Sequence, residues 1–214
     1  MNSEAPVPEK RRKSFLENLD CVEEIPSKAS VFSSGDLYVN NRFGFAFRKP
    51  SSWRFEHLST FADLRNEYDF ASANAEQIEI LQSGSLPLAV ISQARLLSTL
   101  CSSMTIYAEL NPFSEYECVL DAMPDVIKGT SSFIEHFKVV LPARAVSVSG
   151  AEAVEYAATF FYRDNLGNSG PARHRSLIVL REQYLYTLNM IDMPADGIFA
   201  ENEFNQIRKS IVFA

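Results

Sequence analysis

The residues best suited to chemistry gather in the last third of the chain. Asp164 and Asn165 open a segment rich in turn-forming residues, and Arg173, His174 and Arg175 follow shortly after it. Oxygen-rich loops of this kind can bind calcium, but the residue spacing of an EF-hand is absent. The two arginines and the histidine instead offer a small site for an anion or for an acidic partner protein. These five residues are the candidate partner-binding site.

A structural explanation competes with this site. Aspartate and asparagine are favoured turn residues, so a plain hairpin loop accounts for Asp164 and Asn165 without a ligand. Charged side chains at an exposed sheet edge discourage edge-to-edge aggregation, which accounts for residues 173–175. We therefore favour a loop followed by a solvent-exposed strand edge, and we keep the binding site as the alternative.

Motifs of the common catalytic and cofactor sites are missing. The sequence contains no P-loop, no dinucleotide-binding glycine motif, no H-E-x-x-H and no G-x-S-x-G. None of the three histidines has another metal ligand at helical or strand spacing, and the three cysteines form no C-x-x-C pair. We therefore expect no cofactor, no metal site and no enzymatic activity.

Net charge and cysteine content restrict the kinds of partner we expect and the cell compartment we expect. The formal net charge is -7, which repels nucleic acid and anionic membranes, and one short basic run at residues 10–13 reads as a solvated patch. No apolar export signal and no apolar run long enough to cross a bilayer is present. Three widely spaced cysteines argue against a disulfide framework. We expect a cytosolic protein that binds neither nucleic acid nor membrane.

Hydrophobic spacing predicts a tail followed by one α+β domain. Residues 1–30 form a flexible tail with a short amphipathic helix, and residues 31–214 form the domain. Phe43, Phe45 and Phe47 alternate with smaller or charged residues, so three rings lie on one face of a strand that ends at Pro50. Strands at 153–163, 173–181 and 184–191 indicate an antiparallel meander.

Helical spacing predicts the elements that cover the sheet. Helical segments fall between residues 60 and 81, and a final helix spans residues 199–210. Ser114 begins a further helix by the spacing of a capping box, and Pro124 should break or kink that helix. Strands in series with helices at their ends indicate α+β rather than alternating βαβ units.

The segment at residues 43–53, with the sequence FGFAFRKPSSW, resembles the opening strand of the PsbP/Mog-type superfamily. In that family an aromatic-rich strand runs into a proline and then a tryptophan. Residues 148–153 resemble the turn before the family's central hairpin, and residues 177–188 and 204–213 resemble its closing strands and helix. The resemblance implies an antiparallel sheet sandwiched by helices, and it implies an accessory or binding role, as in photosystem extrinsic subunits and a partner of the Ran GTPase. It carries over no functional residue, because no matching functional motif is present.

The sequence thus favours a non-enzymatic accessory domain that binds another protein. A small-ligand-binding protein, or an unrecognised enzyme that uses a cleft between sheet and helices, is the alternative. Convergent polar groups in a deep pocket would favour the alternative, and a flat face with exposed aromatic residues would favour protein binding. Assembly of identical copies through a sheet edge is a third option.

Overall fold

The computed structural model describes residues 31–58, 87–93, 101–132, 134–163, 169–192 and 197–214. The predicted tail at residues 1–30 and the helical segments between residues 60 and 81 lie outside this part of the chain, as do Asp164 and Asn165. The division of the chain at residue 30 therefore stays a prediction.

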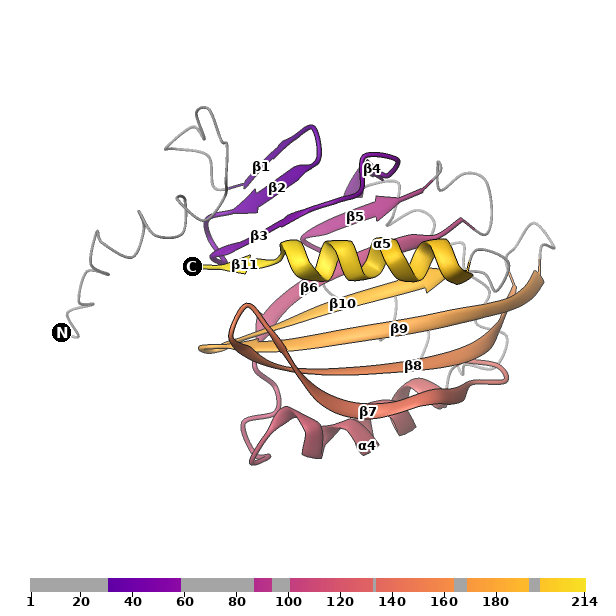
Figure 1. Ribbon diagram of the computed structural model, residues 1–214. Coiled ribbons are helices and arrows are strands. Elements are labelled where there is room, and N and C mark those ends of the chain that lie inside the picture. The colour runs from indigo at the N-terminus through magenta and orange to yellow at the C-terminus, as the bar shows by residue number, and fades with distance from the viewer. Residues whose placement is uncertain (1–30, 59–86, 94–100, 133, 164–168, 193–196) are drawn as a thin grey trace.

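A small antiparallel sheet joins the first three strands to the last one, in the order β1-β2-β3-β11 (Figure 1). Its strands are β1 (Val31–Ser34), β2 (Leu37–Asn40), β3 (Phe45–Arg48) and β11 (Val212–Phe213). The turn between β2 and β3 contains Gly44 at a φ of 60°, a conformation that favours glycine. Asn40 Oδ1 accepts the backbone N–H groups of Arg42 and Phe43, which fixes the start of this turn.

A larger antiparallel sheet has the strand order β4-β5-β6-β10-β9-β8-β7. Its strands are β4 (Arg54–Phe55), β5 (Ala89–Ser92), β6 (Ser103–Leu110), β7 (Lys138–Val148), β8 (Ala151–Arg163), β9 (Ser169–Arg181) and β10 (Tyr184–Asp192). The strands β8, β9 and β10 pair in series, which confirms the predicted meander. β9 begins before its predicted start at residue 173, because Gly170 and Pro171 pair with Tyr162 and Phe161 of β8.

Two described helices pack on the large sheet. α4 (Val119–Ser131) contacts β7 and β8, and α5 (Gly197–Ser210) contacts β10 and, in the small sheet, β3. Figure 1 shows α5 in front of the large sheet, with β9, β8 and β7 running below it in the view. The predicted α+β class is confirmed, with two antiparallel sheets where one was predicted. Within the described ranges, no helix has both the length and the apolar character needed to cross a bilayer.

The apolar core follows the alternation of the strands. Phe45 and Phe47 are 0% exposed and pack in the cluster between the two sheets and α5, where each ring contributes about 1.5–3 kcal/mol. Ala46, which lies between them, belongs to a separate cluster on the other side of β3. This arrangement confirms the predicted period of two. On the opposite face of the large sheet, Met123 of α4 packs against Tyr156.

α4 differs from its prediction at its start, and it is not broken at its proline. The helix begins at Val119, so Ser114 is not its N-cap. Pro124 lies inside the helix, which continues past it to Ser131. Because Pro124 lies in the second turn, the helix loses only the hydrogen bond that this residue would donate to the carbonyl of Leu120. Packing of the helix on the sheet outweighs that loss.

Candidate functional site

Arg173 and Arg175 converge on one carboxylate. They lie two residues apart on β9 and so face the same side of the sheet, and Asp192 of β10 is the register partner of Arg173. The distances from Asp192 Oδ2 to Nη2 of Arg173 and to Nη2 of Arg175 are 2.6 Å and 3.1 Å. Glu201 of α5 lies 3.8 Å from Arg175. The two guanidinium groups compensate Asp192, whose side chain is 0% exposed, for its removal from water.

A second cluster of similar composition lies next to the first. Glu155 of β8 accepts Nε of Arg144 from β7 at 2.8 Å and Nη1 of Arg208 from α5 at 2.8 Å. In the β8–β9 register Glu155 and Arg175 are diagonal neighbours on one face of the sheet. We call the residues of both clusters the arginine face: Arg144, Glu155, Arg173, Arg175, Asp192 and Arg208.

Within the arginine face Asp192 lies deepest and Arg144 lies outermost, while Arg175 is as buried as Glu155. The exposed side-chain fractions are 0% for Asp192, 10% for Glu155, 25% for Arg173, 28% for Arg208 and 61% for Arg144. The charge that this surface presents to solvent is therefore mainly positive. That is the reverse of the chain as a whole, whose formal net charge is -7.

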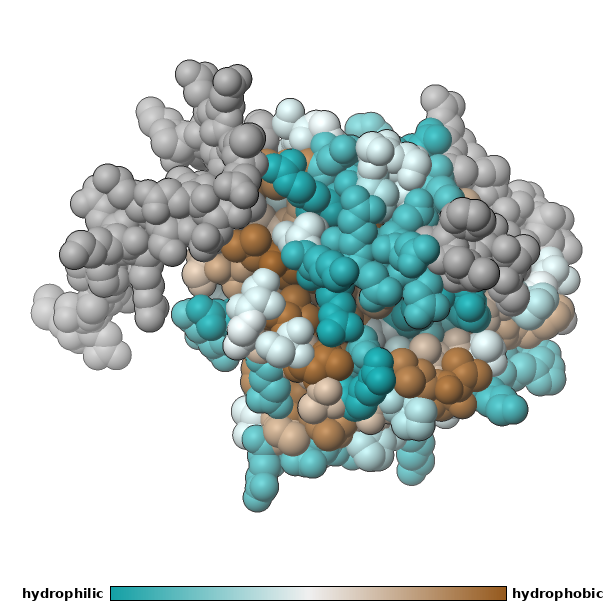
Figure 2. Space-filling view, in the orientation of Figure 1, coloured by the Kyte–Doolittle hydropathy of each residue, from teal (hydrophilic) through white to brown (hydrophobic). Residues whose placement is uncertain are grey.

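The arginine face lies beside α5 and is most exposed at the edge strand of the large sheet. The exposed fraction rises from 11% at Arg175 on β9 to 61% at Arg144 on the edge strand β7, and Val140 on that strand is 52% exposed. Figure 2 shows hydrophilic side chains interleaved with hydrophobic ones in the region below α5. Among the described elements, none crosses β7 and β8 on the side that carries α5 (Figure 1).

His174 lies on the opposite face of the sheet, towards α4. Its Nε2 is 3.2 Å from Asn189 Oδ1, and its ring meets the Tyr156 ring edge-on at 5.6 Å. Burial lowers the pKa of His174, and the Asn189 hydrogen bond offsets part of that shift. Burial also raises the pKa of Tyr156, whose hydroxyl bonds with Thr130 of α4 and with Ser176. These side chains form a neutral polar group that joins α4 to the sheet.

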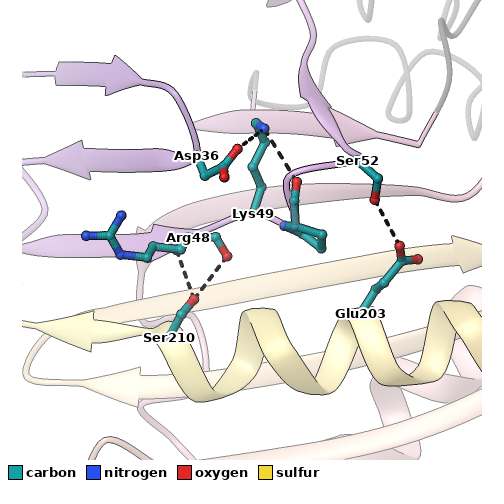
Figure 3. Close-up of polar contacts among 7 residues, drawn as sticks. Asp36, Arg48, Lys49, Ser52, Glu203 and Ser210 are labelled. Atoms are coloured by element: carbon teal, nitrogen blue, oxygen red, sulfur yellow. Dashed lines mark hydrogen bonds and ion pairs between the residues drawn. The ribbon is translucent and has the colours of Figure 1, made fainter.

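The segment at residues 43–53 contains a buried ammonium group. Lys49 is 7% exposed, and its Nζ lies 2.6 Å from Asp36 Oδ1 (Figure 3). The same Nζ lies 5.6 Å from the centroid of the Phe55 ring. Ser210 at the end of α5 bonds through its Oγ with both the backbone N–H and the carbonyl of Arg48. These contacts fasten the β2–β3 hairpin to α5, so the polar groups of this segment serve the fold.

The chemistry available to the arginine face is the recognition of anions. Guanidinium groups bind carboxylate and phosphate oxygens with good geometry, and exposed ones can exchange a solvent contact for a ligand contact. Within the described ranges no group of three or more His, Cys, Asp and Glu side chains is arranged to hold a metal ion. Each of the two buried carboxylates already accepts two guanidinium groups.

The structure brings together part of the predicted site. Arg173 and Arg175 share Asp192, whereas His174 lies on the other face, and Asp164 and Asn165 lie outside the described residues. The expected solvent-exposed strand edge at residues 173–175 is wrong, because β9 lies between β10 and β8 in the sheet. The alternation of a two-faced sheet separates neighbours in sequence, and an edge strand cannot be told from a central one by charge alone.

Four members of the arginine face lie outside the predicted site. Glu155 carries a signal, because it interrupts a strand at a position whose neighbours two residues away, Ala153 and Ala157, are small and apolar. No sequence signal links Arg144 to Arg208, because their meeting requires β7 and α5 both to reach β8. Asp192 ends its strand, where an acid is ordinary.

Comparison with known proteins finds similarity in structure alone. No protein-family model and no curated protein matches the sequence. The chain is similar to cyanobacterial PsbP (CyanoP) from Synechocystis sp. PCC 6803, with 10% identity over 88% of this chain and 99% of that chain and a TM-score of 0.53. It also aligns with LpqN, involved in cell envelope biogenesis of Mycobacterium tuberculosis, with 12% identity over 85% of this chain and 86% of that chain and a TM-score of 0.49.

The match to cyanobacterial PsbP shows that this chain has the PsbP-like fold. The resemblance expected from residues 43–53 is thereby confirmed at the level of architecture. An identity of 10% extends the likeness to the fold and no further, and the LpqN match, whose TM-score is below 0.5, adds nothing to it.

Proposed function

We propose that this chain is a non-enzymatic accessory domain that binds another protein. The open side of the large sheet carries the proposal, since Arg144 on its edge strand is 61% exposed and no described element crosses β7 and β8 on this side (Figure 1). A sheet face ordinarily packs on a second layer of structure. On this side α5 contacts β10, and a partner protein would supply the layer over β8 and β7.

The buried polar groups of the domain bond to one another, and this supports an accessory role. Asp192 and Glu155 each accept two arginines, and the Lys49 ammonium is paired with Asp36. A general base or a nucleophile needs a lone pair directed at its substrate. These groups direct their oxygen and nitrogen atoms at neighbours within the fold. The cytosolic location, which rests on composition, stays a prediction.

Affinity purification with the full chain as bait tests the proposal. We expect a stoichiometric partner, and we expect hydrogen–deuterium exchange of the purified complex to show protection of the β7 and β8 amides. Recovery of a partner whose protection maps to α4 instead would contradict the role of the open sheet. Failure to recover any stoichiometric partner would count against protein binding itself.

One observation favours the alternative of a small-ligand site beneath α4. Nδ1 of His174 is buried and has no hydrogen-bond partner among the described residues, and a bound N–H or O–H group would satisfy it. Nitrogen-15 NMR of the His174 ring during titration with a panel of small polar metabolites tests this alternative. A ligand that shifts both ring nitrogens would support it, and an unchanged ring throughout would contradict it.

A further inference from the structure

We propose that the arginine face binds a short acidic segment of the partner protein, an inference that rests on the proposed function and names the chemistry of its partner. Four guanidinium groups surround two buried carboxylates, and Glu201, at 63% exposed, adds one further negative charge. The surface therefore keeps a net positive charge inside an acidic molecule. An acidic segment is the ligand whose charge complements it.

The arginines also hold more hydrogen-bond donors than the two carboxylates use. An arginine side chain has five N–H donors. Nε of Arg173 and Nη1 of Arg175 have no hydrogen-bond partner among the described residues. Arg144 directs Nε and Nη2 at one oxygen of Glu155, and its side chain is 61% exposed. Arg144 therefore has accessible donors for an incoming carboxylate, whereas the unpaired donors of Arg173 and Arg175 are buried and reach one only when their side chains turn outward.

The spacing of these donors suits an extended polypeptide. Arg144 pairs with Glu155 and Arg173 pairs with Thr159, so the two arginines lie two strand intervals apart across the sheet and four residues apart along it, about 16 Å in all. In an extended segment every second side chain points to the same side, so acidic residues at positions i and i+4 lie about 13 Å apart and suit a segment laid along the diagonal between the two arginines. Leu141 of β7 pairs with Ala157 and so lies on the same face as Arg175, where its half-buried side chain offers an apolar contact beside the charges. The partner segment should therefore combine acidic residues with an apolar one.

Nucleic acid fits this surface less well than an acidic polypeptide does. The net charge of -7 repels a long polyanion at a distance, and the favourable patch is small. The two carboxylates at the base of the arginine face would also lie close to a dense row of phosphates. A short segment with a few carboxylates avoids both penalties.

Fluorescence anisotropy with defined peptides tests the inference on the full chain. The probes are three fluorescein-labelled peptides of one length, made of leucine and glycine with glutamate, glutamine or lysine. We expect the glutamate peptide alone to bind, and we expect added salt to weaken its binding, because exposed charges are screened. Arg144→Glu should weaken this binding by about tenfold or more, because it replaces attraction with repulsion.

Lys128→Glu is the matched control, because it makes the same charge reversal at an exposed position of α4 on the other face of the sheet. It should change binding by less than about twofold, since its distance exceeds the range of strong screened interactions. Arg144→Glu sets a second carboxylate opposite Glu155 and should lower the unfolding midpoint, so circular dichroism checks that it is folded at the assay temperature. Arg144→Ala, which leaves Arg208 paired with Glu155, should keep a midpoint close to that of wild type and should also weaken binding of the glutamate peptide. Equal losses in the two variants, or equal binding of the glutamine peptide, would overturn the inference.

The partner recovered by affinity purification separates the two proposals. If wild type and Arg144→Glu bind it equally, the acidic-segment inference is wrong and the accessory function stands. If the partner is lost with Arg144→Glu and kept with Lys128→Glu, both are supported. If no partner is recovered and no peptide binds, both are wrong.

Discussion

The two faces of the large sheet accommodate buried polar groups in opposite ways. On the side of α5, Asp192 and Glu155 keep their charge partners in the form of arginines. On the side of α4, His174 and Tyr156 exchange hydrogen bonds with neutral neighbours. The same strand, β9, supplies both faces, because its successive residues point in opposite directions.

The difference suggests different uses for the two faces. The hydrogen-bonded group beneath α4 carries no charge, and the unpaired Nδ1 of His174 is buried beneath the helix. A cluster with surplus guanidinium donors at its exposed rim can accept charge from outside the molecule. The α4 face is thus a permanent contact within the domain, and the α5 face is suited to exchange. Four measurements test this contrast.

The largest effect is expected from Asp192→Ala on the α5 face. The change leaves Arg173 and Arg175 without their carboxylate in a largely buried setting, which should cost about 3–5 kcal/mol in the free energy of unfolding. Urea unfolding followed by the fluorescence of Trp53, the single tryptophan, measures the loss. Asp192→Asn keeps an acceptor and should lose less. A loss below about 1 kcal/mol for Asp192→Ala would mean that the fold tolerates Arg173 and Arg175 without the Asp192 carboxylate.

The apolar anchor of the α4 face should give the next largest effect. Met123 is 1% exposed, so Met123→Ala should lower the free energy of unfolding by about 2–5 kcal/mol. Lys128→Ala on the exposed side of the same helix is the control, with an expected change within about 0.5 kcal/mol. Similar losses from both variants would show that the free energy of unfolding depends on the helix propensity of α4 rather than on its contact with the sheet.

Acidification should act on the α4 face through His174. Its folded-state pKa is lowered by burial, so the unfolded chain binds the proton more readily. The free energy of unfolding should therefore fall as the pH drops below about 6.5, by at most about 1.4 kcal/mol per pH unit for this one group. The difference between wild type and His174→Gln, measured in urea from pH 8 to about pH 5, isolates its contribution. A pH-independent difference would show that the face accommodates a charged imidazole.

The smallest stability effect is expected from Arg144→Ala. Its side chain is 61% exposed and Arg208 still pairs with Glu155, so the loss should stay below about 1 kcal/mol. The same urea titration measures it. A loss above about 2 kcal/mol would show that Glu155 needs Arg144 as its charge partner. Arg144 would then stabilise the fold rather than be available to bind a ligand.

Local periodicity was sufficient to predict the strands and much of their orientation. Phe45 and Phe47 face the main core because a strand alternates, and the meander follows from three strands joined by short turns. Periodicity does not say which strands lie at an edge, so the position of β9 was missed. Pro124 shows that a local rule can also mislead. Proline disfavours a helix interior, yet α4 continues past Pro124 to Ser131.

The candidate site was harder to predict than the fold, for the same reason. Arg173 and Arg175 were recognisable by type, but their partner Asp192 is brought to them by the β9–β10 register. Glu155 and Arg208 are 53 residues apart in the chain and meet because α5 returns to the sheet. Side-chain type is local information, whereas charge pairing across elements depends on topology.

The position of β11 bears on the order in which the molecule is made. Val212 and Phe213 pair with Ala46 and Phe45, so a sheet that begins with the first described strand is completed by the last. During synthesis the β2–β3 hairpin must wait until Val212 and Phe213 have been made before it gains that neighbour. Contacts of such high sequence separation form slowly, and the unpaired edge of β3 is open to wrong partners in the interval. Loss of the last few residues should therefore harm the nascent chain more than the small size of β11 implies.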